Sequence, residues 1–169
     1  MKKFKLTSEF IVDISGVKLF RIKALIEFGN VKAGDLGGYI EKEKNLSHMG
    51  NAWVSGNAQV FGNARVFGNA RVSGDAQVSG NAWVFGDAQV FGDARVSGDK
   101  DYAYAHGFGS CNRTTTFFRL KDGDVGVRCG CFYGTLAQFR DNVCETNGET
   151  KKAQEYLMLA DLMDFRFKN

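Results

Sequence analysis

Residues 50–97 read GNAWVS GNAQVF GNARVF GNARVS GDAQVS GNAWVF GDAQVF GDARVS. These are eight consecutive hexapeptides without an insertion, and a fixed period of this kind is typical of solenoid proteins. Each hexapeptide supplies a valine and an alanine for an interior, and a Gly-Asn or Gly-Asp pair that tolerates the left-handed backbone of a corner. Three hexapeptides therefore close one triangular coil, and we predict a left-handed parallel β-helix over residues 50–100.

The register of the repeat predicts which side chains lie inside the coil. Because side chains alternate along a strand, the valines point inward and the residues on either side of each valine point outward. The expected valine stacks on the three sides are Val54, Val72 and Val90, then Val60, Val78 and Val96, then Val66 and Val84. Coils stack at about 4.8 Å, so the regular repeat is only about 13 Å tall.

The segments on either side of the repeat have patterns of their own. Residues 1–49 predict a β-hairpin that turns near residues 13–16, followed by an irregular coil that caps the solenoid. If the register extended backward, His48 would occupy an inward position. Residues 101–169 predict a unit of two strands and two helices, with Thr135 as the N-cap of the first helix and Asn147-Gly148 as its end. This unit is small, so we expect it to dock on the solenoid or on another subunit.

Composition limits the classes of partner. The chain has 21 glycines and no proline, which fits many tight turns between hydrogen-bonded strands. Its net charge of +3 is too small to favour a nucleic-acid partner. The start alternates apolar and charged residues, so we expect neither a signal peptide nor a membrane span. The sequence thus predicts a cytoplasmic protein with reduced cysteines.

Two resemblances add to this interpretation. The repeat over residues 50–97 is similar to that of the hexapeptide acyltransferases, which are left-handed β-helix trimers with a catalytic histidine and acyl-CoA in a cleft between subunits. A group of phage and prophage hexapeptide-repeat proteins, some called polymer-forming, resembles two further parts of the chain. These are RIKALIEFGNVKAGDLGGYIEKEKNLSHMGNAWV at residues 21–54, and GSCNRTTTFFR with CGCFYGTLAQF at residues 109–119 and 129–139. This second resemblance implies a phage or prophage origin, and it supplies no catalytic residue.

The acyltransferase resemblance requires a general base, and the chain has only two histidines, His48 and His106. His106 follows the repeat and is the candidate base, with a solvated histidine in a glycine-rich loop as the alternative. We expect His48 to be a packed or capping residue. The eight hexapeptides contain no extruded loop that could cover acyl-CoA, so the sequence favours a protein without catalytic residues.

A second kind of site would bind a small ligand. Residues 107–116, GFGSCNRTTT, combine glycines with hydrogen-bond donors and a cation, as an anionic or nucleotide ligand needs. The candidate ligand-binding residues are Ser110, Asn112, Arg113 and Thr114, and the alternative is a strand with solvated hydroxyls. Cys129 and Cys131 have poor spacing for zinc, so we expect buried thiols, no metal and no cofactor.

Large side chains beside the inward valines predict an interface. The expected outward residues are Trp53, Phe61, Arg65, Phe67, Trp83, Phe85 and Phe91. Aromatic side chains together with arginine are typical of interface hot spots, and a soluble solenoid rarely leaves them bare. Either the terminal segments or another chain must cover them. We therefore expect a non-catalytic protein that forms a dimer or trimer and binds a partner. The resemblance to phage and prophage proteins implies that this partner is a host protein, such as a defence protein that the chain inhibits.

Overall fold

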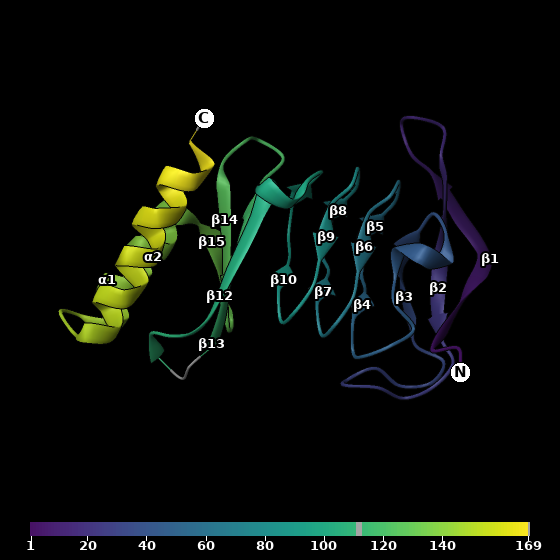
Figure 1. Cartoon of the computed structure of the whole chain (residues 1–169), viewed down its shortest axis with the longest axis horizontal. Helices are drawn as coiled ribbons and strands as arrows, with labels where there is room; N and C mark the ends of the chain where they lie inside the picture. The colour runs from purple at the N-terminus through teal and green to yellow at the C-terminus, as the bar shows by residue number, and fades with distance from the viewer. Residues whose placement is uncertain (111–112, 169) are drawn as a thin grey trace.

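The computed structural model describes residues 1–110 and 113–168. Three parts follow one another along the long axis of the molecule (Figure 1). A β-hairpin lies at one end, the coils of a β-solenoid form the middle, and a sheet with two helices lies at the other end. The solenoid predicted from the hexapeptides is confirmed, and the protein is mainly β.

The coils are held by parallel ladders with the predicted register. The first side stacks β4, β7 and β10, the second β5, β8 and β11, and the third β6 and β9. The strands are β4 (Trp53–Val54), β5 (Gln59–Val60), β6 (Arg65–Val66), β7 (Arg71–Val72), β8 (Gln77–Val78), β9 (Trp83–Val84), β10 (Gln89–Val90) and β11 (Arg95–Val96). Every valine of these strands is buried, as are the repeat alanines near the corners. Burial of these small apolar side chains supplies the solenoid's core.

At each corner the glycine and the residue after it have different roles. The glycines from Gly50 to Gly92 have φ between 60° and 70°, a region in which a Cβ atom is strained. At three corners the asparagine that follows, at positions 57, 63 and 69, donates a hydrogen bond to its counterpart one coil later. Asn69 Nδ2, for example, donates to Asp87 Oδ1 at 3.2 Å. The corners are therefore connected by side-chain ladders as well as by the backbone.

The N-terminal hairpin continues one side of the solenoid. Strands β1 (Phe4–Val12) and β2 (Lys18–Ala24) are antiparallel, and β2 also pairs with β3 (Leu36–Ile40). Strand β3 pairs in parallel with β5, so the hairpin and the second side of the solenoid form one six-stranded sheet. Both the hairpin and the capping coil agree with the sequence prediction.

The first coil is two residues longer than the others. Leu46 pairs with Val66, 20 residues on, whereas Val54 pairs with Val72, 18 residues on. Leu46 therefore takes the inward position, and the prediction that a backward extension would place His48 there is wrong. Instead, the His48 ring stacks on Phe4 with 4.2 Å between centroids.

The C-terminal unit contains four strands, where the sequence predicted two. The strands are β12 (Tyr102–Phe108), β13 (Arg113–Arg119), β14 (Val125–Cys129) and β15 (Phe132–Thr135), and they form one antiparallel sheet. Helices α1 (Leu136–Asn147) and α2 (Lys151–Phe167) follow. Thr135 caps α1 and Gly148 ends it, as predicted. Strand β12 was not predicted, because YAYAHGF follows directly where the hexapeptide pattern ends.

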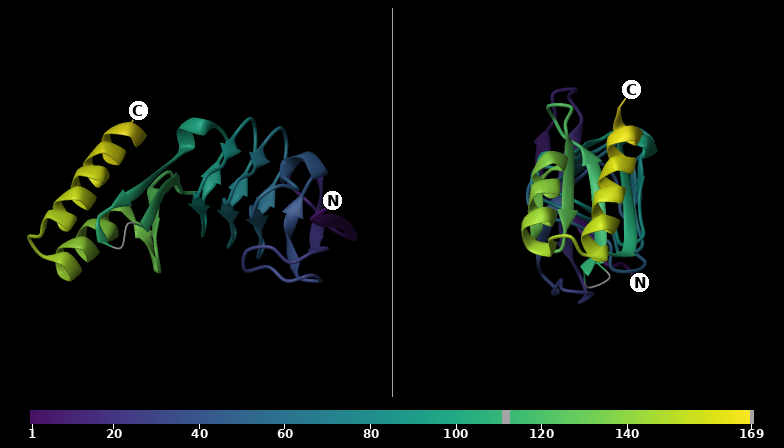
Figure 2. Two further views of the ribbon diagram at one scale, coloured as in Figure 1. Left: turned by 60° about the horizontal axis from the view of Figure 1, so that its bottom comes forward. Right: turned by 90° about the vertical axis from the view of Figure 1, so that its left-hand side faces the viewer.

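This sheet is a middle layer between the solenoid and the helices (Figures 1 and 2). Phe118 packs into the core of the solenoid, while its neighbour Phe117 packs with Phe139 and Tyr156 of the helices. Alternation along β13 thus buries both of its faces, and the C-terminal unit is docked on the last coil.

Side chains cap the two ends of the solenoid. They supply hydrogen-bond donors at one end and acceptors at the other. At the N-terminal end the backbone exposes carbonyl groups, and Lys3 Nζ donates to Ala52 O at 2.8 Å while Asn45 Nδ2 donates to Ala64 O at 2.9 Å.

At the C-terminal end the backbone exposes N–H groups, which need acceptors. The N–H of Trp83 donates to Asp99 Oδ1 at 2.8 Å, and that of Gln89 donates to Thr116 Oγ1 at 2.9 Å. A solenoid end without such partners would be an open sheet edge.

Candidate binding surfaces

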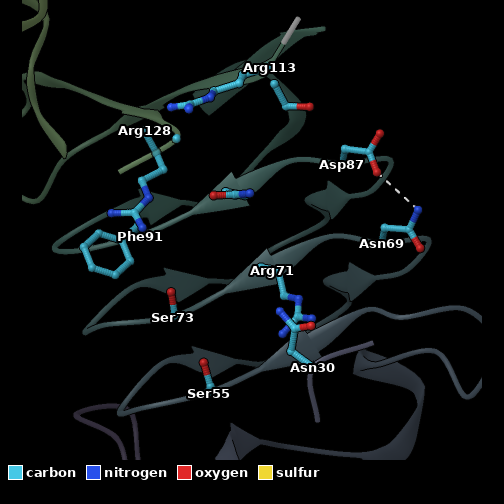
Figure 3. Close-up of a pocket in the computed structure, with 12 residues that line it drawn as sticks. Asn30, Ser55, Asn69, Arg71, Ser73, Asp87, Phe91, Arg113 and Arg128 are labelled. Carbon is cyan, nitrogen blue, oxygen red and sulfur yellow. Dashed lines mark hydrogen bonds between the residues drawn. The ribbon is translucent and has the colours of Figure 1, made fainter. Parts of the chain in front are cut away.

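A cleft of about 570 Å³ lies on the first side of the solenoid, beneath the edge of the C-terminal sheet (Figure 3). Arg71 of β7 lies on the floor and points toward Asn30, while Arg113 of β13 and Arg128 of β14 line the side formed by the C-terminal sheet. The residues that line the cleft are Asn30, Ser55, Asn69, Arg71, Ser73, Asp87, Gln89, Phe91, Arg113, Thr114, Arg128 and Gly130. Three separate parts of the chain therefore form this cleft.

Arg71 lies on the outward face of the solenoid, between one residue that the N-terminal segment covers and one that the C-terminal sheet covers. Arg71 stacks between Trp53 and Gln89 on the outward face of the first side. The N-terminal segment covers Trp53 and reaches Arg71 at Gly29, and the C-terminal sheet begins at Gln89, whose N–H is bonded to Thr116. The outward face at Arg71 is therefore left half-open between the two terminal units.

The cleft carries most of the chain's excess positive charge. Three arginines line it against one aspartate, Asp87, while the whole chain has a net charge of +3. None of the three arginines makes an ion pair with a carboxylate among the residues that the structure describes. Burial, together with the nearby Arg71 guanidinium, lowers the pKa of Lys3 to about 8. The arrangement is suited to an anion.

The predicted ligand-binding residues divide between different places. Arg113 and Thr114 line the cleft. The backbone N–H of Ser110 instead donates to the Tyr156 hydroxyl at 3.0 Å. This bond connects Ser110, which follows β12, to helix α2. Asn112 lies outside the described residues. Sequence reasoning missed Arg71, because the repeat has arginine at several outward positions and only the fold brings this one to the cleft. It also missed Arg128, which reaches the cleft through the pairing of β14 with β13.

The third side of the solenoid has an aromatic surface, which we define as Arg65, Phe67, Trp83 and Phe85. The Phe67 and Phe85 rings stack with 5.2 Å between centroids, and the Trp83 ring lies edge-on to Phe67 at 6.0 Å. The Arg65 guanidinium lies 5.9 Å from the Trp83 ring centroid. The exposed fractions of Trp83 and Phe85 are 47% and 40%. The structure thus leaves this part of the predicted interface open.

The other predicted interface residues are covered to different degrees by the terminal units. Trp53 is only 3% exposed and packs edge-on against Phe28, so its assignment to an outward interface is wrong. Phe91 is half-buried between Arg128 and Tyr133 of the C-terminal sheet. Phe61 is also half-buried, beside the tip of the N-terminal hairpin.

The two histidines lie at opposite ends of the solenoid. His106 Nδ1 is 2.8 Å from Thr114 Oγ1 on the exposed edge of the C-terminal sheet. His48 Nδ1 accepts the Lys3 backbone N–H at 3.2 Å. Each ring thus has a neighbour that explains its position.

The prediction of buried thiols is confirmed for Cys129 and wrong for Cys131. Cys129 is buried, where its sulfur accepts a hydrogen bond from Thr115 Oγ1 at 3.3 Å, and Cys131 and Cys144 are exposed. Cys111 lies outside the described residues. Across residues 1–110 and 113–168, no three histidine, cysteine or acidic side chains gather as metal ligands would.

One further apolar feature was not predicted. Met158, Leu162 and Phe165 form an exposed stripe on the outer face of α2, at the end of the molecule farthest from the hairpin. Their spacing matches one helical face, opposite the buried face that includes Ala160 and Met163. Neither helix of the described chain is long and apolar enough to cross a membrane.

Comparison with known families agrees with the fold. The family model described as the YdcK beta solenoid repeat matches residues 58–74, 76–90 and 88–99. The match falls within the coils and their exit and covers neither the cleft arginines of the C-terminal sheet nor the helices. No curated protein sequence matches the chain. The chain is therefore similar to YdcK-type β-solenoids in its repeat.

Proposed function

We propose that this chain is a non-catalytic β-solenoid protein that self-associates through its aromatic surface and binds a protein partner in the bacterial cytoplasm. The observation that carries the proposal is the exposure of Trp83 and Phe85, which the C-terminal sheet contacts at its edge through Tyr104 but does not cover. Aromatic side chains beside an arginine are the commonest hot spots of protein interfaces. A rigid coil also holds them in place before binding, which lowers the entropic cost of association.

Molar mass by light scattering tests the self-association. We expect the wild-type chain to exceed its monomer mass of 18.6 kDa, and the double variant Trp83→Ser, Phe85→Ser to return to it. Phe10→Ser is the matched control, because Phe10 is 45% exposed but lies on the N-terminal hairpin. A wild-type monomer at all concentrations, or equal loss of mass in the control, would contradict the proposed interface.

Tryptophan fluorescence gives a second measurement at the same surface. The chain has two tryptophans, of which Trp53 is buried, so Trp53→Phe leaves Trp83 as the only reporter. Association should shift the emission of Trp83 to shorter wavelength because the indole loses contact with water. An emission maximum that stays constant across the concentrations at which mass increases would place the interface elsewhere.

The resemblance to phage and prophage proteins supports a host protein as the partner, and inhibition of a host defence is the role that we propose for the complex. Acyl transfer is the alternative that the hexapeptide repeat supports. Titration with acetyl-CoA distinguishes them. Binding that His106→Ala abolishes would favour transfer, with His106 as the base, over a purely binding role.

A further inference from the structure

We propose that the cleft beneath the C-terminal sheet binds a small ligand with at least two phosphate groups and a hydroxyl-bearing part, of the nucleoside diphosphate kind. This site is separate from the aromatic surface, which lies on the third side of the coil. The proposal therefore does not depend on self-association.

The first step is the charge of the cleft. Arg71, Arg113 and Arg128 all line it, and none is neutralised by a carboxylate of a described residue. Arginine binds phosphate oxygens through two parallel N–H bonds, and such charge-assisted bonds are about twice as strong as neutral ones. Because two arginines come from the C-terminal sheet and one from the solenoid floor, a ligand with two separated anionic groups fits better than a single anion.

The second step is the positioning of these arginines by their neighbours. The Arg128 guanidinium lies over the Phe91 ring, 4.5 Å from its centroid. The Arg113 guanidinium passes over Gly130, where a Cβ atom would clash with it, and Arg71 lies beside Gly29. The cation–π contact and the close approach to the two glycines restrict the arginine side chains before binding. These side chains therefore lose little conformational entropy when a ligand binds.

The third step is the neutral and acidic part of the lining. Ser55 and Ser73 occupy equivalent positions on successive coils, and Gln89 and Thr114 add further polar groups. Asp87 accepts one hydrogen bond, from Asn69, and a carboxylate can accept several. Asp87 can therefore accept a hydrogen bond from a hydroxyl group of the ligand. Its negative charge repels a ligand that is anionic along its whole length.

The size of the cleft completes the argument. Its volume of about 570 Å³ is within the range of roughly 300–1,000 Å³ that small-molecule sites occupy. Phe91, the one aromatic side chain in the lining, is already engaged by Arg128. The lining is otherwise polar, so an apolar ligand is disfavoured, and the chain's small net charge does not suit a long polyanion.

Calorimetry with four probes tests the ligand class. We expect ADP and pyrophosphate to bind, and adenosine and citrate to bind at least tenfold more weakly. Binding of citrate equal to that of pyrophosphate would overturn the phosphate assignment. The absence of heat and of any shift in melting temperature with both ADP and pyrophosphate at millimolar concentration would overturn the site.

Matched variants locate the binding. Arg71→Gln and Arg128→Gln should each weaken pyrophosphate binding at least tenfold, whereas Arg95→Gln, with the same change of charge on the second side of the solenoid, should not. Asp87→Asn should weaken ADP binding and leave pyrophosphate binding unchanged or stronger. An equal loss in Arg95→Gln would show non-specific attraction and contradict the cleft. Circular dichroism of each variant separates a lost site from a lost fold.

Discussion

Lys3 shows how one residue links the stability of the solenoid to pH. Its ammonium group is buried beneath the first coil, where it donates to the carbonyl oxygens of Ala52 and Gly50 at 2.8 and 3.3 Å. Burial and the Arg71 guanidinium lower the pKa of Lys3 from 10.5 to about 8. Between these two values the unfolded chain keeps a proton that the folded chain releases, so stability rises with pH across this window.

We expect the Lys3→Met variant to lose this dependence. The wild-type free energy of unfolding, relative to the variant, should increase on the order of 1 kcal/mol between pH 7.5 and 9.5. Urea denaturation of both proteins at the two pH values measures the difference, and the cysteines and tyrosines cancel because both proteins contain them. A difference that does not change with pH, or that falls, would contradict the depressed pKa.

The two tryptophans show the limit of prediction for single residues. Trp53 and Trp83 occupy the same position of identical GNAWV sequences, so the sequence predicts the same exposure for both. The structure buries Trp53 because Phe28 of the N-terminal segment packs against it, while Asp99 and Tyr102 bond to the backbone of Trp83 and leave that residue 47% exposed. Inward positions are predictable because the repeat defines them. Outward positions depend on segments distant in sequence.

At the scale of elements, β3 converts an antiparallel hairpin into a parallel coil. Gly37 and Gly38 allow this close approach, because a Cβ atom at Gly38 would lie 2.6 Å from Ala58 O and 2.9 Å from Val54 Cγ1. The sequence predicts a capping coil here from its scattered glycines, but not which of them are required. Strand β15 was not predicted as a separate strand, because only a two-residue turn at Gly130 and Cys131 divides it from β14.

The Gly38→Ala variant should therefore be less stable than the wild type by about 2 kcal/mol, the usual cost of overpacking a tight site. Gly98→Ala is the control, because Gly98 has an extended backbone and open space where its Cβ atom would lie. Urea denaturation measures both. Equal stability of the two variants would mean that β3 can move away from the coil without cost.

At the scale of the whole molecule, the cleft exists only because the three parts are stacked end to end. Arg71 belongs to the repeat, and Arg113 and Arg128 belong to neighbouring strands of the C-terminal sheet. The sequence predicts Arg113 and Thr114 as ligand-binding residues from their local composition. The sequence does not predict that Arg71 lies near these two residues, because the docking of the sheet on the last coil depends on the burial of Phe118.

The stacking of identical coils also makes the solenoid a molecular ruler. The number of coils sets the distance between the arginine of the floor and those of the overhanging sheet, and one more coil adds about 4.8 Å. Duplicating residues 74–91 in tandem inserts three complete hexapeptides between Arg71 and the C-terminal unit.

The lengthened chain should fold with an unchanged circular dichroism spectrum, bind pyrophosphate more weakly and favour tripolyphosphate relative to the wild type. Calorimetry with the two polyphosphates measures this change, and an unaltered preference would mean that the arginines act separately. Because such a duplication preserves every corner and every valine stack, a lineage of these proteins could change the length of the ligand it accepts by copying 18 residues, without altering a single contact residue.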